Sequence, residues 1–252
     1  MAQRASEEIR DVLEAVEILR LLVTRAREEL RSVAPYLVSF GAYSSLNLLL
    51  MLLGYRGLWA ELLLPTLALA TSLKFGPFPT VFLWAAVAAA ALGVQWLFQN
   101  SLITWSTLFV GIGGTMGAMY VMAERRGRLY EERLVFSPRI AVGWGMLTAG
   151  MWLLVLSPTM QKVGTTAPEL HGALWGYAVG LGLVVTGLLS PLLLWAGIIG
   201  VVGAPLAALY LRSEDVLLAV FLLMGIAMMV TGFRSLRTKP VMATGPDVSS
   251  RG

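Results

Sequence analysis

The stretch ERRGRLYEERLVFSPR, Glu124 to Arg139, is the longest charged interruption in an otherwise apolar run from about Tyr36 to Phe233. It divides that run into two blocks of similar length, and five of its residues are arginine. Loops rich in lysine and arginine stay on the cytoplasmic side of a membrane. The stretch therefore predicts both how the chain is divided and which side of a bilayer its middle faces.

The composition identifies lipid as the solvent of most of the chain. Of 252 residues, 57% are hydrophobic and only 13% are charged, whereas a soluble domain carries roughly 25% charged residues. So few charges cannot coat a globule in water. The chain has no cysteine, which excludes disulfides and thiolate metal sites. We predict an all-α, polytopic integral membrane helical bundle.

The lengths of the apolar segments predict about eight transmembrane helices, because one crossing needs ~20 apolar residues. Residues 172–211 form an apolar run of about twice that length, so we place a turn between Ser190 and Gly197. The predicted spans are 36–55, 58–73, 80–98, 101–123, 140–157, two within 172–211, and 216–233. The predicted units are a cytoplasmic helix (1–35), a four-helix block (36–123), a basic loop (124–139), a second four-helix block (140–233) and a disordered tail (234–252).

The distribution of basic residues predicts the orientation. With an even number of spans, both termini lie on the same side as the central loop. All but three of the 19 lysines and arginines then fall on that side, the exceptions being Arg56, Lys162 and Arg212. The positive-inside bias therefore predicts a protein of the cell membrane with both termini in the cytoplasm.

Before the first span, residues 6–33 have the pattern of a helix outside the bilayer, which we expect to break or kink at Pro35. Its apolar residues alternate spacings of three and four, which is a heptad seam. The candidate partner-contact residues on this seam are Ile9, Val12, Val16, Leu19, Val23 and Leu30. The seam either forms a coiled coil with a partner or a second copy, or packs on the protein's own spans or in the headgroup layer.

A few polar residues inside the predicted spans are candidates for an intramembrane polar path. Ser39, Tyr43 and Asn47 are four apart and share one helix face, and Glu61 and Gln95 lie in the next two spans. A polar side chain deep in a bilayer must face protein or a wet cavity. The alternative is an interhelical hydrogen bond that fixes packing.

Two glycine pairs four residues apart predict close helix packing, because glycine lets two backbones approach in lipid. They are Gly113 with Gly117, and Gly176 with Gly180. No catalytic set, nucleotide loop or metal-ligand spacing occurs in the sequence. We therefore expect no enzyme activity, no cofactor, no metal and no nucleic-acid partner, and the sequence identifies no small-molecule substrate.

Three stretches resemble a group of uncharacterised prokaryotic multi-pass membrane proteins with a charged N-terminal helix and a glycine-rich C-terminal hairpin. They are ILRLLVTRAREELRSVAPYLVSFGAY (Ile18 to Tyr43), LWGYAVGLGLVVTGLLSPLLLWAGIIG (Leu174 to Gly200) and GIAMMVTGF (Gly225 to Phe233). The resemblance covers about a third of the chain. It implies a membrane protein without an assigned activity.

The preferred hypothesis is a non-enzymatic scaffold or accessory subunit that contacts a protein partner through its cytoplasmic helix and basic loop. The alternative is a small secondary transporter or channel with a polar path near Tyr43, Asn47 and Glu61.

Overall fold

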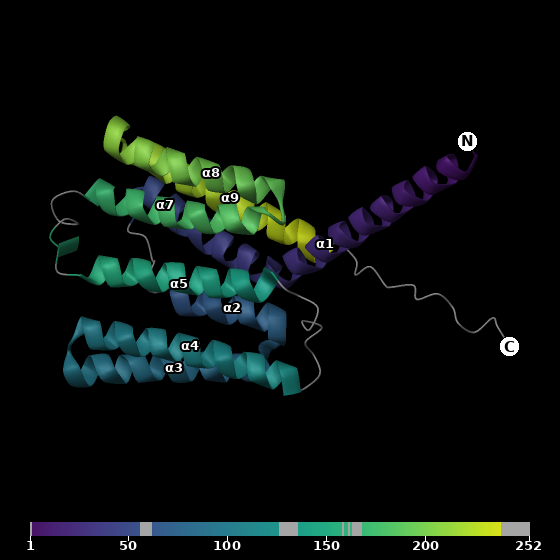
Figure 1. The fold of residues 1–252 in the computed structure, drawn as a ribbon. Helices are drawn as coiled ribbons and strands as arrows, with labels where there is room; N and C mark the ends of the chain where they lie inside the picture. Colours follow the sequence, from purple (N-terminus) through teal and green to yellow (C-terminus); the bar gives the residue numbers. More distant parts are fainter. Residues whose placement is uncertain are drawn as a thin grey trace.

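The computed structural model describes residues 2–55, 62–125, 136–157, 159–160, 162 and 168–237, and every regular element in them is helical. Figure 1 shows α2 to α9 lying side by side as a bundle from which the start of α1 projects. The elements are α1 (Ala2–Leu52), α2 (Leu63–Phe75), α3 (Pro77–Phe98), α4 (Ser101–Arg125), α5 (Phe136–Leu156), α7 (Pro168–Gly187), α8 (Pro191–Pro205), the π-helix η2 (Leu206–Leu211) and α9 (Glu214–Arg237). This confirms the predicted all-helical class.

Five helical segments in the described residues are long and apolar enough to cross a membrane. They are Val12–Leu52, Thr80–Phe98, Glu169–Gly187, Pro191–Leu211 and Glu214–Arg237, and Leu63–Phe75 and Val142–Val155 are shorter apolar helices. Large apolar side chains are exposed along the outer faces, as on Val110 and Leu153. These features indicate membrane association, and the number of crossings stays a prediction.

Pro35 does not break the first helix, so of the two expected outcomes, a break or a kink, the break is wrong. α1 runs without interruption from Ala2 to Leu52, and Pro35 lies buried inside it. A proline inside a helix removes one backbone hydrogen bond, but packing on neighbouring helices can hold the helix together across it. Here α9 packs along α1 on both sides of Pro35. The projecting segment and the first apolar segment are therefore one continuous helix, which changes direction where it enters the bundle (Figure 1).

Glycines set how closely α1 and α9 approach. A Cβ added at Gly41 would lie 2.6 Å from the carbonyl oxygen of Gly225, and one added at Gly232 would lie 3.0 Å from that of Ala34. Because glycine itself carries no side chain at these two points, the two helices approach closely enough for backbone to meet backbone. α1 is thus anchored in the bundle mainly by α9.

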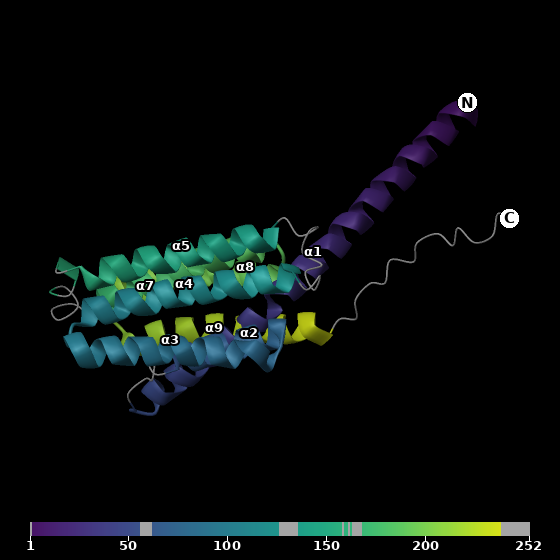
Figure 2. The same cartoon turned by 90° about the horizontal axis from the view of Figure 1, so that it is seen from below.

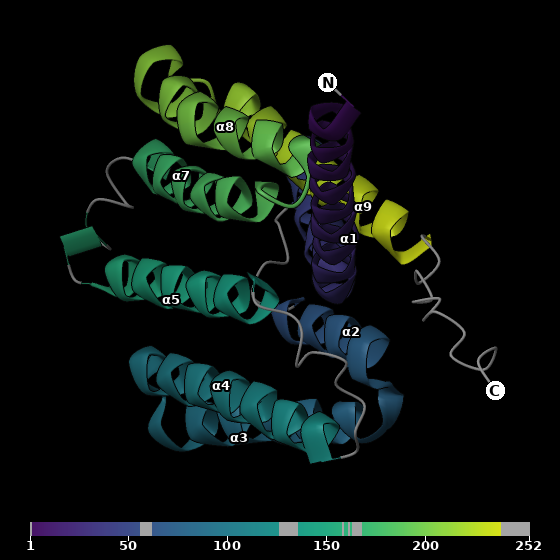
Figure 3. The same cartoon turned by 45° about the vertical axis from the view of Figure 1, so that its right-hand side comes forward.

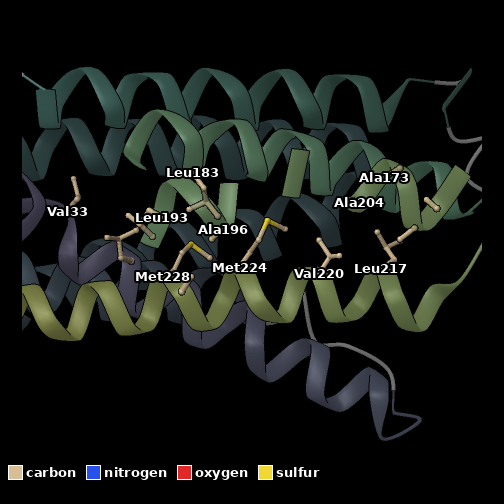
Figure 4. Packing of buried hydrophobic residues seen from close by; sticks show 14 residues of the cluster. Val33, Ala173, Leu183, Leu193, Ala196, Ala204, Leu217, Val220, Met224 and Met228 are labelled. Atoms are coloured by element: carbon tan, nitrogen blue, oxygen red, sulfur yellow. The ribbon is translucent and has the colours of Figure 1, made fainter. Parts of the chain in front are cut away.

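The main core lies where α7, α8 and α9 meet α1 (Figure 4). Leu183, Leu193 and Met224 are fully buried there. A second, smaller cluster around Leu67 and Trp84 holds α2, α3 and α4 together. In Figure 3 the hairpin of α3 and α4 lies at one side of the bundle and the α7–α8 pair at the other.

The turn within the long apolar run begins two residues before the predicted interval and ends at its first residue, Ser190. Residues 188–190 form the turn, and α8 begins at Pro191 after Ser190 in an extended conformation. Proline suits the first position of a helix, because a backbone N–H at that position would have no hydrogen-bond partner within the helix. Gly197, at the other end of the predicted interval, lies inside α8, where an added Cβ would come within 2.5 Å of the backbone nitrogen of Val184.

Candidate functional site

The projecting part of α1 carries an apolar seam that nothing in the described chain covers. The side chains of Val12, Val16, Leu19 and Val23 are each between 50% and 62% exposed. Figures 1 and 2 both show this segment pointing away from the other helices. Ile9 lies in α1, but its side chain is outside the described set. We call these four exposed residues the docking seam.

The same heptad stripe changes its role where α1 enters the bundle. Leu30 is partly buried against the main core, and Val33 belongs to that core. Packing on the protein's own helices, one of the two alternatives, therefore applies to this end of the stripe. The structure does not place the docking seam on the bundle.

Two of the five candidate path residues are sealed inside the protein. Ser39 and Asn47 are buried in α1, and the Asn47 side-chain amide donates to the backbone carbonyl of Tyr43, one turn earlier, at 2.9 Å. Within the described residues, Asn47 Oδ1 and Ser39 Oγ have no hydrogen-bond partner. With at most 2% of either side chain exposed, packing has closed this position.

Of the three remaining path candidates, Tyr43 is half-buried one turn from Asn47 on the same face of α1, and the other two do not join this group. Gln95 is exposed on α3, where its Oε1 accepts a hydrogen bond from the Thr104 hydroxyl at 2.6 Å. Glu61 lies outside the described residues. The described structure therefore does not bring Ser39, Asn47 and Gln95 together around one opening.

Sequence analysis missed that the polar stripe continues toward the projecting end of α1. Glu29, Ser32 and Tyr36 extend it at spacings of three and four, and Glu29 is fully buried. Lys74, at the end of α2, donates to Ser32 Oγ at 3.3 Å, and its ammonium lies 5.7 Å from the centre of the Tyr36 ring. This contact holds the end of α2 against α1. The signal was visible in the spacing, but the expected break at Pro35 concealed it.

The two glycine pairs differ in their surroundings. A Cβ added at Gly180 would lie 2.6 Å from the backbone nitrogen of Val201, and one at Gly176 would overlap the Cβ of Ala204. At Gly113 and Gly117 an added Cβ would meet nothing within 4 Å. Gly176 and Gly180 thus make a close contact between α7 and α8, whereas Gly113 and Gly117 make none within the described chain.

Asn47→Leu is expected to leave stability unchanged or to raise it by less than about 1 kcal/mol. The substitution removes an amide whose Oδ1 has no partner in the described residues and whose one hydrogen bond lies within its own helix. Apolar replacement of such a group is nearly neutral. Thermal unfolding in mild detergent measures the effect.

Thr71→Val is the matched control for Asn47→Leu, because both side chains are fully buried. The Thr71 hydroxyl donates to the Leu67 carbonyl at 2.6 Å and accepts from the indole N–H of Trp84 at 2.8 Å. Its loss leaves the indole donor unpaired, and we expect a cost of about 1–2 kcal/mol. A larger loss for Asn47→Leu than for Thr71→Val would mean that Oδ1 has a partner and would revive the polar path.

Comparison with protein-family profiles, with curated proteins and with solved structures finds no match for this chain. Function is therefore inferred from the residues and their arrangement alone.

Proposed function

We propose that this chain is an integral membrane protein of eight spans that holds the start of α1 in the cytoplasm as a docking helix for another protein. It acts as a non-enzymatic scaffold or accessory subunit. The observation that carries the proposal is the docking seam: Val12, Val16, Leu19 and Val23 are at least half exposed on a helix that continues into the bundle core.

The position of the basic residues supports the cytoplasmic placement. Arg125 ends α4, Arg139 lies in the first turn of α5, and Arg234 and Arg237 end α9. Figure 1 shows these helix ends at the end of the bundle from which α1 projects. A cluster of arginine at one end of a membrane bundle favours that end as the cytoplasmic one. The described ends of the predicted basic loop, residues 124–125 and 136–139, lie here, and residues 126–135 are outside the described set.

The exposure of the docking seam supports the proposal that another protein covers it. Burying one large aliphatic side chain contributes roughly 1.5–3 kcal/mol, and four such side chains lie in one row on the projecting segment. A contiguous exposed apolar surface on the watery side of a membrane protein is typical of an interaction site. Transport lacks comparable support, because Ser39 and Asn47 are buried and Gln95 lies apart from them.

The docking function is tested by site-specific photo-crosslinking in intact cells. A photo-reactive residue at Val16 or at Leu19 is expected to give one defined protein adduct. The matched control is the same residue at Glu14, which lies about 160° from Val16 and about 140° from Leu19 around the helix and is equally part of the projecting segment. It is expected to give no adduct. Equal adducts at all three positions, or lipid adducts alone at Val16, would contradict the proposal.

A further inference from the structure

The docking seam has a basic edge. With 100° per residue, Arg20 and Arg27 fall beside Val16 and Val23 on one edge of the apolar face, and both arginines are exposed. The acidic residues Glu14 and Glu17 fall on the far side of the helix from the seam. In the heptad abcdefg, with Val16 and Val23 at position a, the two arginines occupy position e. A side chain at position e can reach across to a partner helix.

A second copy of this chain does not complement that edge. Copies in one membrane project to the same side, so their helices pair in parallel. In a parallel coiled coil, the residue at heptad position g of one helix faces the residue at position e of the next heptad on the partner helix. Arg20 would then face Ala15, and Arg27 would face Leu22. Neither arginine would meet a carboxylate, so self-pairing leaves this edge without electrostatic partners.

A membrane surface does not fit the direction of the helix. Figures 1 and 2 show the segment leading away from the end of the bundle. To lie flat in the headgroup layer the segment would have to bend further where it leaves the bundle, and α1 is an uninterrupted helix through that region. Pro35, the proline inside α1, is buried, so the packing around it fixes the direction in which the segment leaves the bundle.

We propose that the occupant of the docking seam is an amphipathic helix of another protein that carries aspartate or glutamate beside its own apolar seam. Its carboxylates pair with Arg20 and Arg27 while its apolar residues cover Val16, Leu19 and Val23. The contact extends over two to three heptads. Beyond Ala26 the next residue of the apolar stripe, Leu30, packs against the protein's own core and is not free to contact a partner. This inference rests on the proposed docking function and names the chemistry of its partner.

The test uses the full-length protein in detergent micelles and two synthetic three-heptad peptides. Both peptides have leucine at the seam positions; one has glutamate and the other lysine at every flanking position. Fluorescence anisotropy at low salt is expected to show roughly tenfold tighter binding of the glutamate peptide, since two exposed ion pairs are exchanged for two repulsions. The difference is expected to shrink at high salt.

Charge reversal supplies the specific readout. The double variant Arg20→Glu, Arg27→Glu is expected to prefer the lysine peptide, whereas a merely apolar contact would not change its preference. Arg10→Glu is the control, because Arg10 lies on the face opposite the seam and the glutamate preference should persist.

The possible failures are distinguishable. Equal binding of both peptides would overturn the acidic partner and leave the docking function standing. A parent protein that binds neither peptide but forms a dimer that Val16→Asp dissociates would identify a second copy as the occupant and overturn the proposal. Binding of neither peptide, with no dimer and with protection of the segment only by anionic vesicles, would overturn both this inference and the docking function.

Discussion

Replacing Gly180 with valine is expected to lower the melting temperature of the protein by roughly 5–10 °C. An added Cβ at Gly180 would lie 2.6 Å from the nitrogen of Val201 and 2.8 Å from the carbonyl carbon of Gly200. Both are backbone atoms of α8 and cannot rotate away. Overpacking of this kind costs about 1–3 kcal/mol or more, which corresponds to several degrees in a protein of this size. Intrinsic tryptophan fluorescence during heating measures the change.

Gly117→Val is the matched control. It introduces the same side chain at a glycine of the same spacing pattern, but an added Cβ there meets nothing within 4 Å. Its melting temperature is expected to stay within about 2 °C of the parent, as for a substitution at an open surface. Equal losses in both variants would mean that another protein copy covers this face of α4.

The contrast between the two glycine pairs shows where sequence reasoning reaches its limit in a membrane protein. Spacing shows that Gly113 and Gly117 share a helix face, as Gly176 and Gly180 do. It does not show whether that face meets a helix or lipid. In water, hydrophobicity would separate the two cases, but lipid tails are as apolar as leucine.

The apolar helices themselves could be predicted, because the length of an apolar run and its charged ends are local properties. The ends predicted for α3 and α4 lie within three residues of those observed. The continuity of α1 through Pro35 could not, because it depends on packing against α9, far away in the sequence. That one misplaced break also concealed the polar stripe from Glu29 to Asn47 and the contact between Lys74 and Ser32.

Leu183→Ala is expected to cost about 2–5 kcal/mol, the range for a leucine whose removal leaves a cavity. Leu183 extends from α7 into the core between α8 and α9 and is fully buried (Figure 4). Transfer between protein and lipid contributes little, so most of this cost is the dispersion contact that neighbouring side chains lose. Thermal unfolding in mild detergent gives the value.

Leu153→Ala removes the same atoms from the outer face of α5, where Leu153 is 74% exposed. Lipid tails or detergent can flow into the space that is left, so no cavity forms and we expect a cost below about 1 kcal/mol. The difference between the two variants therefore measures packing, separated from hydrophobicity. If Leu153→Ala cost as much as Leu183→Ala, the outer face of α5 would have to be packed against another protein, because only a close-packed neighbour leaves a void when a side chain is shortened.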